Sequence, residues 1–96
     1  MRDYEIMFIL DPNLDDSGVE TESERVQSLI TARGGEVVSF EPWGRRRLAY
    51  PIRRFKDGYY AVSRFRIAPL EADALERNLK LTESVIRFLI IRPDAA

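Results

Sequence analysis

The sequence predicts an α+β fold in which a four-stranded antiparallel sheet carries two helices on one face. Four segments alternate apolar and polar residues with a period of two, which is typical of strands. Two further segments repeat apolar residues at helical spacing, one after the first strand and one before the last. The 96 residues, 45% of them hydrophobic and 32% charged, have the length and composition of one small folded domain, predicted to span 1–96.

The first strand is predicted over residues 2–10. Its core-facing side is apolar and comprises Tyr4, Ile6, Phe8 and Leu10. The opposite side starts polar and becomes apolar at Met7 and Ile9, which indicates a central strand or a binding surface. Asp11-Pro12-Asn13 ends the strand, because proline cannot continue a ladder and the two polar residues favour turns.

The first helix follows this turn. Ser17 and Glu20 have the spacing of a capping box, and Arg33 is predicted to lie in the last turn before Gly34-Gly35. The buried face is predicted to comprise Val19, Ser23, Val26, Leu29 and Ile30. The acidic residues near its start lack the spacing of a calcium loop, so no metal site is predicted.

Residues 36–52 are predicted to form a long strand that bends at Gly44. Asp57-Gly58 is a tight-turn dipeptide, so we expect the chain to reverse there and residues 59–67 to return antiparallel. Arg53, Arg54 and Lys56 are then expected to be loop charges.

Pro69 is predicted to start the second helix, which buries Ala72, Leu75 and Leu79. The last strand is predicted over residues 85–92, and residues 93–96 are expected to be a frayed tail. Right-handed crossovers place the first and third strands in the centre of the sheet.

The sheet face without helices is predicted to remain open. It is too apolar for simple exposure, so we expect a partner to cover part of it. Its members are Glu5, Met7, Ile9, Tyr60, Val62, Arg64, Arg87, Leu89 and Ile91.

Positive charge is concentrated in the middle of the chain. Residues 1–41 hold ten acids and three bases, whereas residues 44–66 hold eight bases and one acid, within a net charge of -1. Three consecutive arginines, Arg45 to Arg47, lie between Trp43 and Tyr50. Guanidinium groups bind phosphate and stack on rings, so the stretch predicts an RNA contact in which these bases form one patch. The alternative is a solvated hairpin end that protects an edge strand.

Cysteine and histidine are both absent. Their absence removes thiol chemistry, the usual zinc ligands and every Ser-His or Cys-His nucleophile pair. We therefore predict no catalytic residue, metal, cofactor or small-molecule substrate, and do not expect an enzyme. The chain shows no secretory signal pattern, and its longest apolar run, residues 88–91, is too short for a bilayer, so we expect a cytoplasmic protein without a membrane partner.

Four stretches together resemble bacterial small-subunit ribosomal protein six. They are Met1-Arg2-Asp3-Tyr4-Glu5, Asp11-Pro12-Asn13-Leu14, Gly44-Arg45-Arg46-Arg47-Leu48-Ala49-Tyr50-Pro51-Ile52 and Gly58-Tyr59-Tyr60. The resemblance runs to about Arg92. It implies a ferredoxin-like βαββαβ fold and a structural role in the small ribosomal subunit. It also implies binding to the central domain of the small-subunit (16S) rRNA jointly with small-subunit ribosomal protein eighteen, which aids subunit assembly.

The resemblance implies two groups of site residues. The bent strand is expected to face the partner protein through Trp43, Arg45, Arg46, Arg47, Leu48, Ala49 and Tyr50. The candidates for rRNA contact, expected near one rim of the sheet, are Arg2, Tyr4, Arg87 and Arg92. The alternatives are a core position for Tyr4 and simple solvation for Arg87 and Arg92.

A different class of function is compatible with the same fold. A homodimeric ligand-sensing module would cover its open sheet with a second copy and hold a small molecule between the sheets. The arginine cluster argues against it, because such sheet pairing does not need concentrated positive charge. An acylphosphatase-type enzyme ranks last, since the sequence has no glycine-rich phosphate loop followed by a catalytic arginine.

Overall fold

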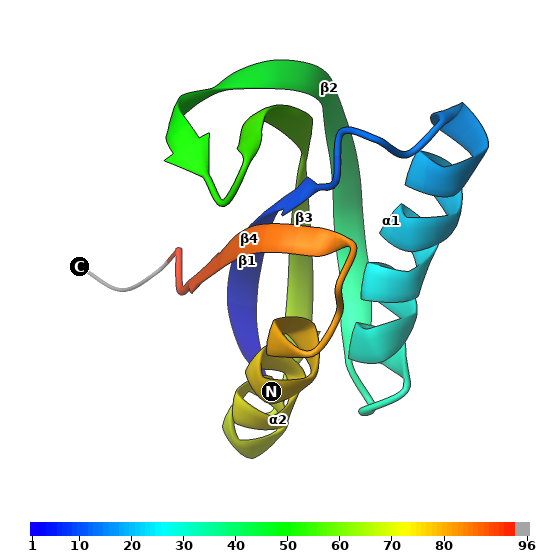
Figure 1. The fold of residues 1–96 in the computed structure, drawn as a ribbon. Helices are drawn as coiled ribbons and strands as arrows, with labels where there is room; N and C mark the ends of the chain where they lie inside the picture. Colours follow the sequence, from blue (N-terminus) through cyan, green and yellow to red (C-terminus); the bar gives the residue numbers. More distant parts are fainter. Residues whose placement is uncertain (94–96) are drawn as a thin grey trace.

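Strands and helices follow one another in the predicted βαββαβ order. A computed structural model describes residues 1–93, so all but the first residue of the tail predicted at 93–96 lies outside the described residues. The elements are β1 (Arg2–Leu10), α1 (Asp16–Thr31), β2 (Glu36–Ile52), β3 (Phe55–Ile67), α2 (Pro69–Lys80) and β4 (Val85–Ile91) (Figure 1). The strands form one antiparallel sheet in the order β2-β3-β1-β4, which confirms that the first and third strands are central.

Both helices bury their apolar faces against the same side of the sheet. The predicted core side of β1 is buried, and Phe8 and Leu10 are 0% and 1% exposed. Val26 and Ile30 of α1 and Leu75 of α2 belong to the same core cluster. Each fully buried side chain of this size stabilises the fold by about 1.5–3 kcal/mol, so this layer supplies most of the apolar stabilisation.

Both predicted ends of α1 are wrong. The N-cap is Asp15, whose side chain accepts a hydrogen bond from the backbone N–H of Gly18 at 2.7 Å, so the helix begins before Ser17. A carboxylate caps as well as a hydroxyl does, and the earlier residue takes the position. At the other end the helix stops at Thr31, and Arg33 lies beyond it and pairs with Glu71 of α2 at 3.1 Å.

The predicted position of the β2–β3 turn is also wrong. The chain reverses at Arg53-Arg54, since Ile52 and Phe55 already pair, and β3 therefore begins at Phe55. Gly58 lies inside β3, where an added Cβ would lie 2.4 Å from Cγ2 of Ile9. The glycine permits a close approach of β3 to β1, a tertiary requirement that a turn-forming dipeptide does not reveal.

The predicted bend at Gly44 is confirmed. Gly44 has a φ of +82°, and the β2–β3 register shifts between Pro42 and Gly44. Beyond the bend, residues 44–58, here called the arm, curl over the open face of the sheet (Figure 1). The arm buries a second small cluster, which consists of Ile9, Leu48 and Ile86 with Ile52, Phe55 and Tyr60 packed against it.

Candidate protein and RNA interface

A shallow apolar hollow of about 160 Å³ lies where the arm meets the open face. Its lining comes from the arm and from β1, β3 and β4. The lining residues are Met7, Ile9, Leu48, Ala49, Tyr50, Ile52, Tyr60, Arg87 and Leu89. Leu48 is only 7% exposed and forms the floor, whereas Tyr50 is 56% exposed at the edge. Leu89 and Ile91 extend the apolar surface along β4, with 54% and 44% of their area exposed. The predicted open face is therefore partly covered by the arm and partly uncovered.

Tyr50 and Arg87 join the arm to β4. The guanidinium of Arg87 lies 5.5 Å from the centre of the Tyr50 ring, and its Nη1 donates a hydrogen bond to the Tyr50 hydroxyl. Arg87 pairs with Ile9 in the sheet register, so it lies toward the arm and away from the start of β1. The prediction that Arg87 shares a rim with Arg2 is wrong.

Tyr4 lies in the core, as the alternative interpretation of this residue proposed. It is 8% exposed, and its ring stacks on Phe65 with 5.7 Å between ring centres. Little of the ring remains available to a base. Arg2 is exposed at the start of β1, and Arg92 follows Ile91, which pairs with Glu5 near the same end of β1. The structure thus brings Arg2 and Arg92 to one end of the sheet, without Tyr4 at the surface and without Arg87.

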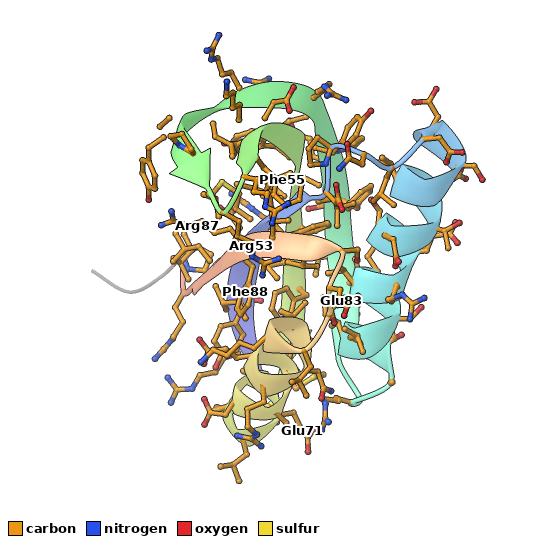
Figure 2. The ribbon with its side chains drawn as sticks, in the orientation of Figure 1. Arg53, Phe55, Glu71, Glu83, Arg87 and Phe88 are labelled. Atoms are coloured by element: carbon orange, nitrogen blue, oxygen red, sulfur yellow. The ribbon has the colours of Figure 1, made fainter. Side chains whose placement is uncertain are left out.

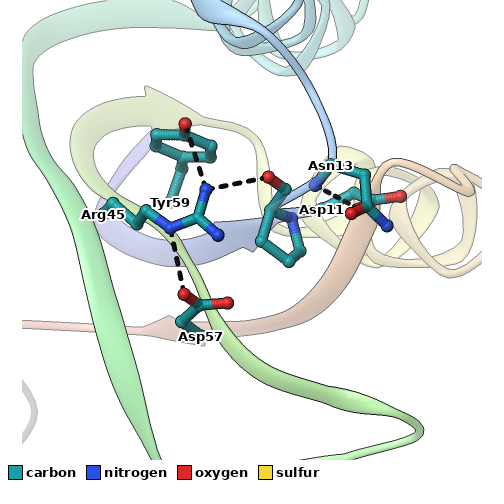
Figure 3. A network of polar contacts seen from close by, with 6 residues as sticks. Asp11, Asn13, Arg45, Asp57 and Tyr59 are labelled. Carbon is teal, nitrogen blue, oxygen red and sulfur yellow. Dashed lines mark hydrogen bonds and ion pairs between the residues drawn. The ribbon is translucent and has the colours of Figure 1, made fainter.

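Arg45 is occupied by contacts within the protein (Figure 3). Its Nε donates to Oδ2 of Asp57 at 2.9 Å, and its Nη1 donates to the carbonyl oxygen of Pro12 at 3.0 Å. The guanidinium also lies 5.6 Å from the centre of the Tyr59 ring. The hydrogen bonds that Arg45 donates to the Tyr59 hydroxyl and then to the Asp57 carboxylate raise the pKa of Arg45 above its ordinary value. The residue therefore ties the arm to the loop between β1 and α1.

The other two consecutive arginines have different surroundings. The guanidinium of Arg46 lies 5.2 Å from the centre of the Trp43 ring, and Trp43 is 40% exposed. The side chain of Arg47 is exposed and forms no hydrogen bond or ion pair within residues 1–93. Of the three, Arg47 is thus the one whose guanidinium is available to a partner.

The predicted single arginine patch is wrong, because the sheet divides the bases into two groups. Arg64 pairs with Glu5 at 3.0 Å, and Arg66 pairs with Asp3 at 3.2 Å. Both acids belong to β1 and neutralise these arginines far from the bend. The unneutralised bases gather on the arm instead.

The sequence analysis did not predict which residues form the turn between the end of β2 and the start of β3. Arg53 and Arg54 form the hairpin turn, and Lys56 belongs to β3. A period-two series can be read back from Ala61 and Tyr59 through Asp57 to Phe55, but Asp57 is polar and Phe55 packs in the second cluster. The turn-like pattern of Asp57-Gly58 obscured that continuation.

Comparisons with known proteins agree over almost the whole chain. A family model described as ribosomal protein S6 matches residues 3–92. The chain belongs to the ribosomal protein S6 family. Small ribosomal subunit protein bS6 of Symbiobacterium thermophilum is 45% identical over 93 residues, which cover 97% of this chain and 98% of that protein. The bS6 protein of Caldanaerobacter subterraneus is 44% identical over 94 residues, covering 98% and 99%.

A solved structure shares the fold as well. The crystal structure of 30S ribosomal protein S6 from Thermotoga maritima superposes with a TM-score of 0.89 at 36% identity, covering 95% of this chain and 86% of that one. S6 membership confirms the resemblance read from the sequence, the ferredoxin-like fold and the prediction that the protein is not an enzyme. The S6 family is a family of small-subunit ribosomal proteins.

Residues 1–93 lack both a membrane-spanning helix and a cluster of metal ligands. No helix in this range is long and apolar enough to cross a membrane. No group of three or more acidic, histidine or cysteine side chains in the same range is arranged to hold a metal ion.

Proposed function

We propose that this protein is a structural constituent of the small ribosomal subunit, in the cytoplasm, that binds small-subunit ribosomal protein eighteen through its open face and arm. Together the two proteins bind the central domain of the small-subunit (16S) rRNA and aid subunit assembly. The observation that carries the proposal is the uncovered apolar surface of Leu89 and Ile91 beside the hollow under the arm. Contiguous apolar surface of this kind marks an interaction site.

The arm and Trp43, which directly precedes it, supply the residue types that dominate protein interfaces. Trp43 and Tyr50 are exposed aromatics, and each has a guanidinium over its ring that restricts its motion. Tyrosine, tryptophan and arginine are enriched among the residues that contribute most to binding energy. In this proposal Leu48 and Ala49 shape the surface, Arg45 positions the arm and Arg47 offers a charge to the partner.

The protein alone has little general attraction for RNA, because its net charge is -1 and the outer side of α1 carries exposed acids at Asp16, Glu20 and Glu24. Affinity for a polyanion grows with the number of phosphates that cations neutralise. A basic protein partner would add such cations. Arg2 and Arg92, at one end of the sheet, are the residues of this chain that we propose at the RNA surface near that end.

The test is binding to a central-domain rRNA fragment over a range of salt, with and without protein eighteen. We expect tight, salt-sensitive binding only when the partner is present. Leu89→Asp should lower affinity for protein eighteen by at least about tenfold, because it places a charge on the apolar contact surface. The matched control is Leu81→Asp, since Leu81 is 82% exposed and follows α2, away from the open face.

Two results would contradict the proposal. One is the absence of RNA binding at every salt concentration with the partner present. The other is a stable homodimer in sedimentation that neither protein eighteen nor RNA alters, which would favour the ligand-sensing alternative.

A further inference from the structure

The cations of the hairpin turn differ from several other arginines of this protein, because no carboxylate among residues 1–93 forms an ion pair with them. Arginines paired with acids include Arg25, Arg33, Arg45, Arg64 and Arg66. Within residues 1–93, the side chains of Arg53, Arg54 and Lys56 are exposed and make no hydrogen bond or ion pair. Asp57, the acid nearest to them in the chain, is bonded to Arg45. The turn therefore carries uncompensated positive charge.

The three cations line a surface hollow of about 530 Å³ between the turn and the loop at Pro12 and Asn13. Arg45 adds a fourth cation to its wall, and Asp57 is the one acid among its lining residues. A hollow of this size admits a phosphodiester group, and several guanidinium groups converge on the space.

Arg53 also faces a second hollow, on the side of β4. This hollow, of about 350 Å³, is lined by Lys80 and Arg87 as well as Arg53, with Glu76 as its acid. Figure 2 shows Arg53 lying over β4, close to Arg87 and Phe88. Arg53 thus stands between two basic hollows, so positive charge continues from the loop after β1, across the turn, to β4.

The backbone at the turn holds these cations in place. Phe55 packs against the cluster of Ile9, Leu48 and Ile86 that anchors the arm. Arg53 has a φ of +56°, in the left-handed region that favours glycine. Non-glycine residues in this region are retained where the surroundings or a function of the side chain require them, and they cluster at functional sites. The side chain of Arg53 thus occupies a position at which the backbone alone would favour glycine.

We propose that Arg53, Arg54 and Lys56 form a contact site for the phosphate backbone of RNA. The inference rests on the proposed function above and adds a second RNA contact to it. The site is separate from Arg2, because Arg2 pairs with Ile67 at the far end of β3 from the turn. Exposed guanidinium and ammonium groups with no acidic partner bind phosphates without reading the base sequence. Contacts at two ends of the sheet would fix the orientation of the protein on a folded RNA.

The test uses the complex of the full chain with protein eighteen and the central-domain rRNA fragment. Arg53→Gly removes the cation and also relieves the backbone, so a loss of binding cannot be attributed to unfolding. Arg54→Gln and Lys56→Gln remove the other two charges. Each lost phosphate contact should weaken binding roughly five- to tenfold near 0.1 M salt and reduce the salt slope by about 0.7–0.9. Arg53→Lys should retain the salt slope, because it keeps the charge.

The matched control is Arg77→Gln on the exposed side of α2, which changes the net charge equally. It should leave RNA affinity unchanged. Affinity for protein eighteen, measured without RNA, should be unchanged in the turn variants, and their resistance to urea should equal or exceed that of the parent.

Three outcomes would overturn the inference while leaving the proposed function intact. The turn variants could bind RNA with the parent affinity and slope, or Arg77→Gln could weaken binding as much as they do. They could also lose affinity for protein eighteen, which would make the turn a protein contact. An absence of RNA binding by the parent complex itself would instead overturn the proposed function, and with it the inference.

Discussion

The ring of Tyr50 on the arm lies beneath the guanidinium of Arg87 on β4, 5.5 Å from the ring centre. The two residues are 37 positions apart in the chain, and the Arg87 side chain also donates a hydrogen bond to the Tyr50 hydroxyl. Stacking of arginine on an aromatic ring combines a charge interaction with contact area. The contact closes the arm over the apolar hollow and holds it in one position above the open face.

Arg87→Ala should therefore loosen the arm. Amide hydrogens of residues 46–52 should exchange faster, because local opening of the arm no longer requires breaking this contact. Affinity for protein eighteen should fall with the loss of a preorganised surface. Hydrogen exchange followed by mass spectrometry measures the first effect, with Arg77→Ala as the control. Unchanged exchange in the arm would show that Leu48 and the second cluster hold it without Arg87.

Gly58→Ala should destabilise the fold by about 1–3 kcal/mol through overpacking. The new Cβ would lie 2.4 Å from Cγ2 of Ile9 and 3.1 Å from the carbonyl oxygen of Leu10, so β1 and β3 would have to separate. Urea denaturation measures the change.

Gly44 offers a contrast for the same measurement. An added Cβ there meets nothing within 4 Å, but φ is +82°. Gly44→Ala should cost about 1–2 kcal/mol through the backbone alone, and Gly44→Asn should recover part of it, since asparagine tolerates this region. Gly58→Asn should recover nothing. Equal costs for Ala and Asn at Gly44, or no cost at Gly58, would contradict these two explanations.

Leu75→Ala should cost about 2–5 kcal/mol, because the removed atoms leave a cavity in the main core. Leu75 is 0% exposed, whereas Leu70 on the same helix is 82% exposed and provides the control. Leu70→Ala should stay within about 0.5 kcal/mol of the parent. Under conditions where the Leu75 variant remains folded, its affinity for protein eighteen should be retained. A stability change below 1 kcal/mol would show that the core repacks around the substitution.

Arg47→Ala should weaken assembly with protein eighteen and RNA while leaving the unfolding free energy within about 0.5 kcal/mol of the parent. The Arg47 side chain has no hydrogen bond or ion pair to lose within residues 1–93. Arg45→Ala should behave differently, since its contacts with Asp57 and Pro12 hold the arm to the loop after β1. Binding and urea denaturation of both variants distinguish the roles. Unfolding of the Arg47 variant with retained binding would contradict them.

The elements were predictable because their signals are local. The period-two pattern of β1, the apolar stripe of each helix and the central glycine of the bend are read over neighbouring residues, and the structure agrees with them. The errors in the elements came from choices between similar local signals. Asp15 and Ser17 can both cap a helix, and Asp57-Gly58 resembles a turn that the chain makes at Arg53-Arg54.

The positions of the candidate site residues were less predictable, because they depend on the register in which the strands of the sheet pair. The sequence places Arg87 and Arg92 in one strand, but the pairing of Ile9 with Arg87, next to an irregularity at Leu10, assigns them to different ends of the sheet. Tyr4, by contrast, lies in the core as the period-two pattern of β1 predicts, and its ring stacks on Phe65. The pairing of Ile9 with Arg87 joins segments near opposite ends of the chain and leaves no pattern in either segment.

Composition, periodicity and the central arginine-rich motif are properties of the chain itself, and they established the order of elements, the core face and the S6 family membership that the comparisons confirm. The tertiary structure determined which arginines form ion pairs and hydrogen bonds within the protein. Arg64 and Arg66 meet the acids of β1, and Arg45 meets Asp57 and Pro12, so these charges are neutralised or occupied. Arg47, Arg53 and Arg54 remain available, because the free energy of an ion pair depends on distances that exist only after distant strands pair.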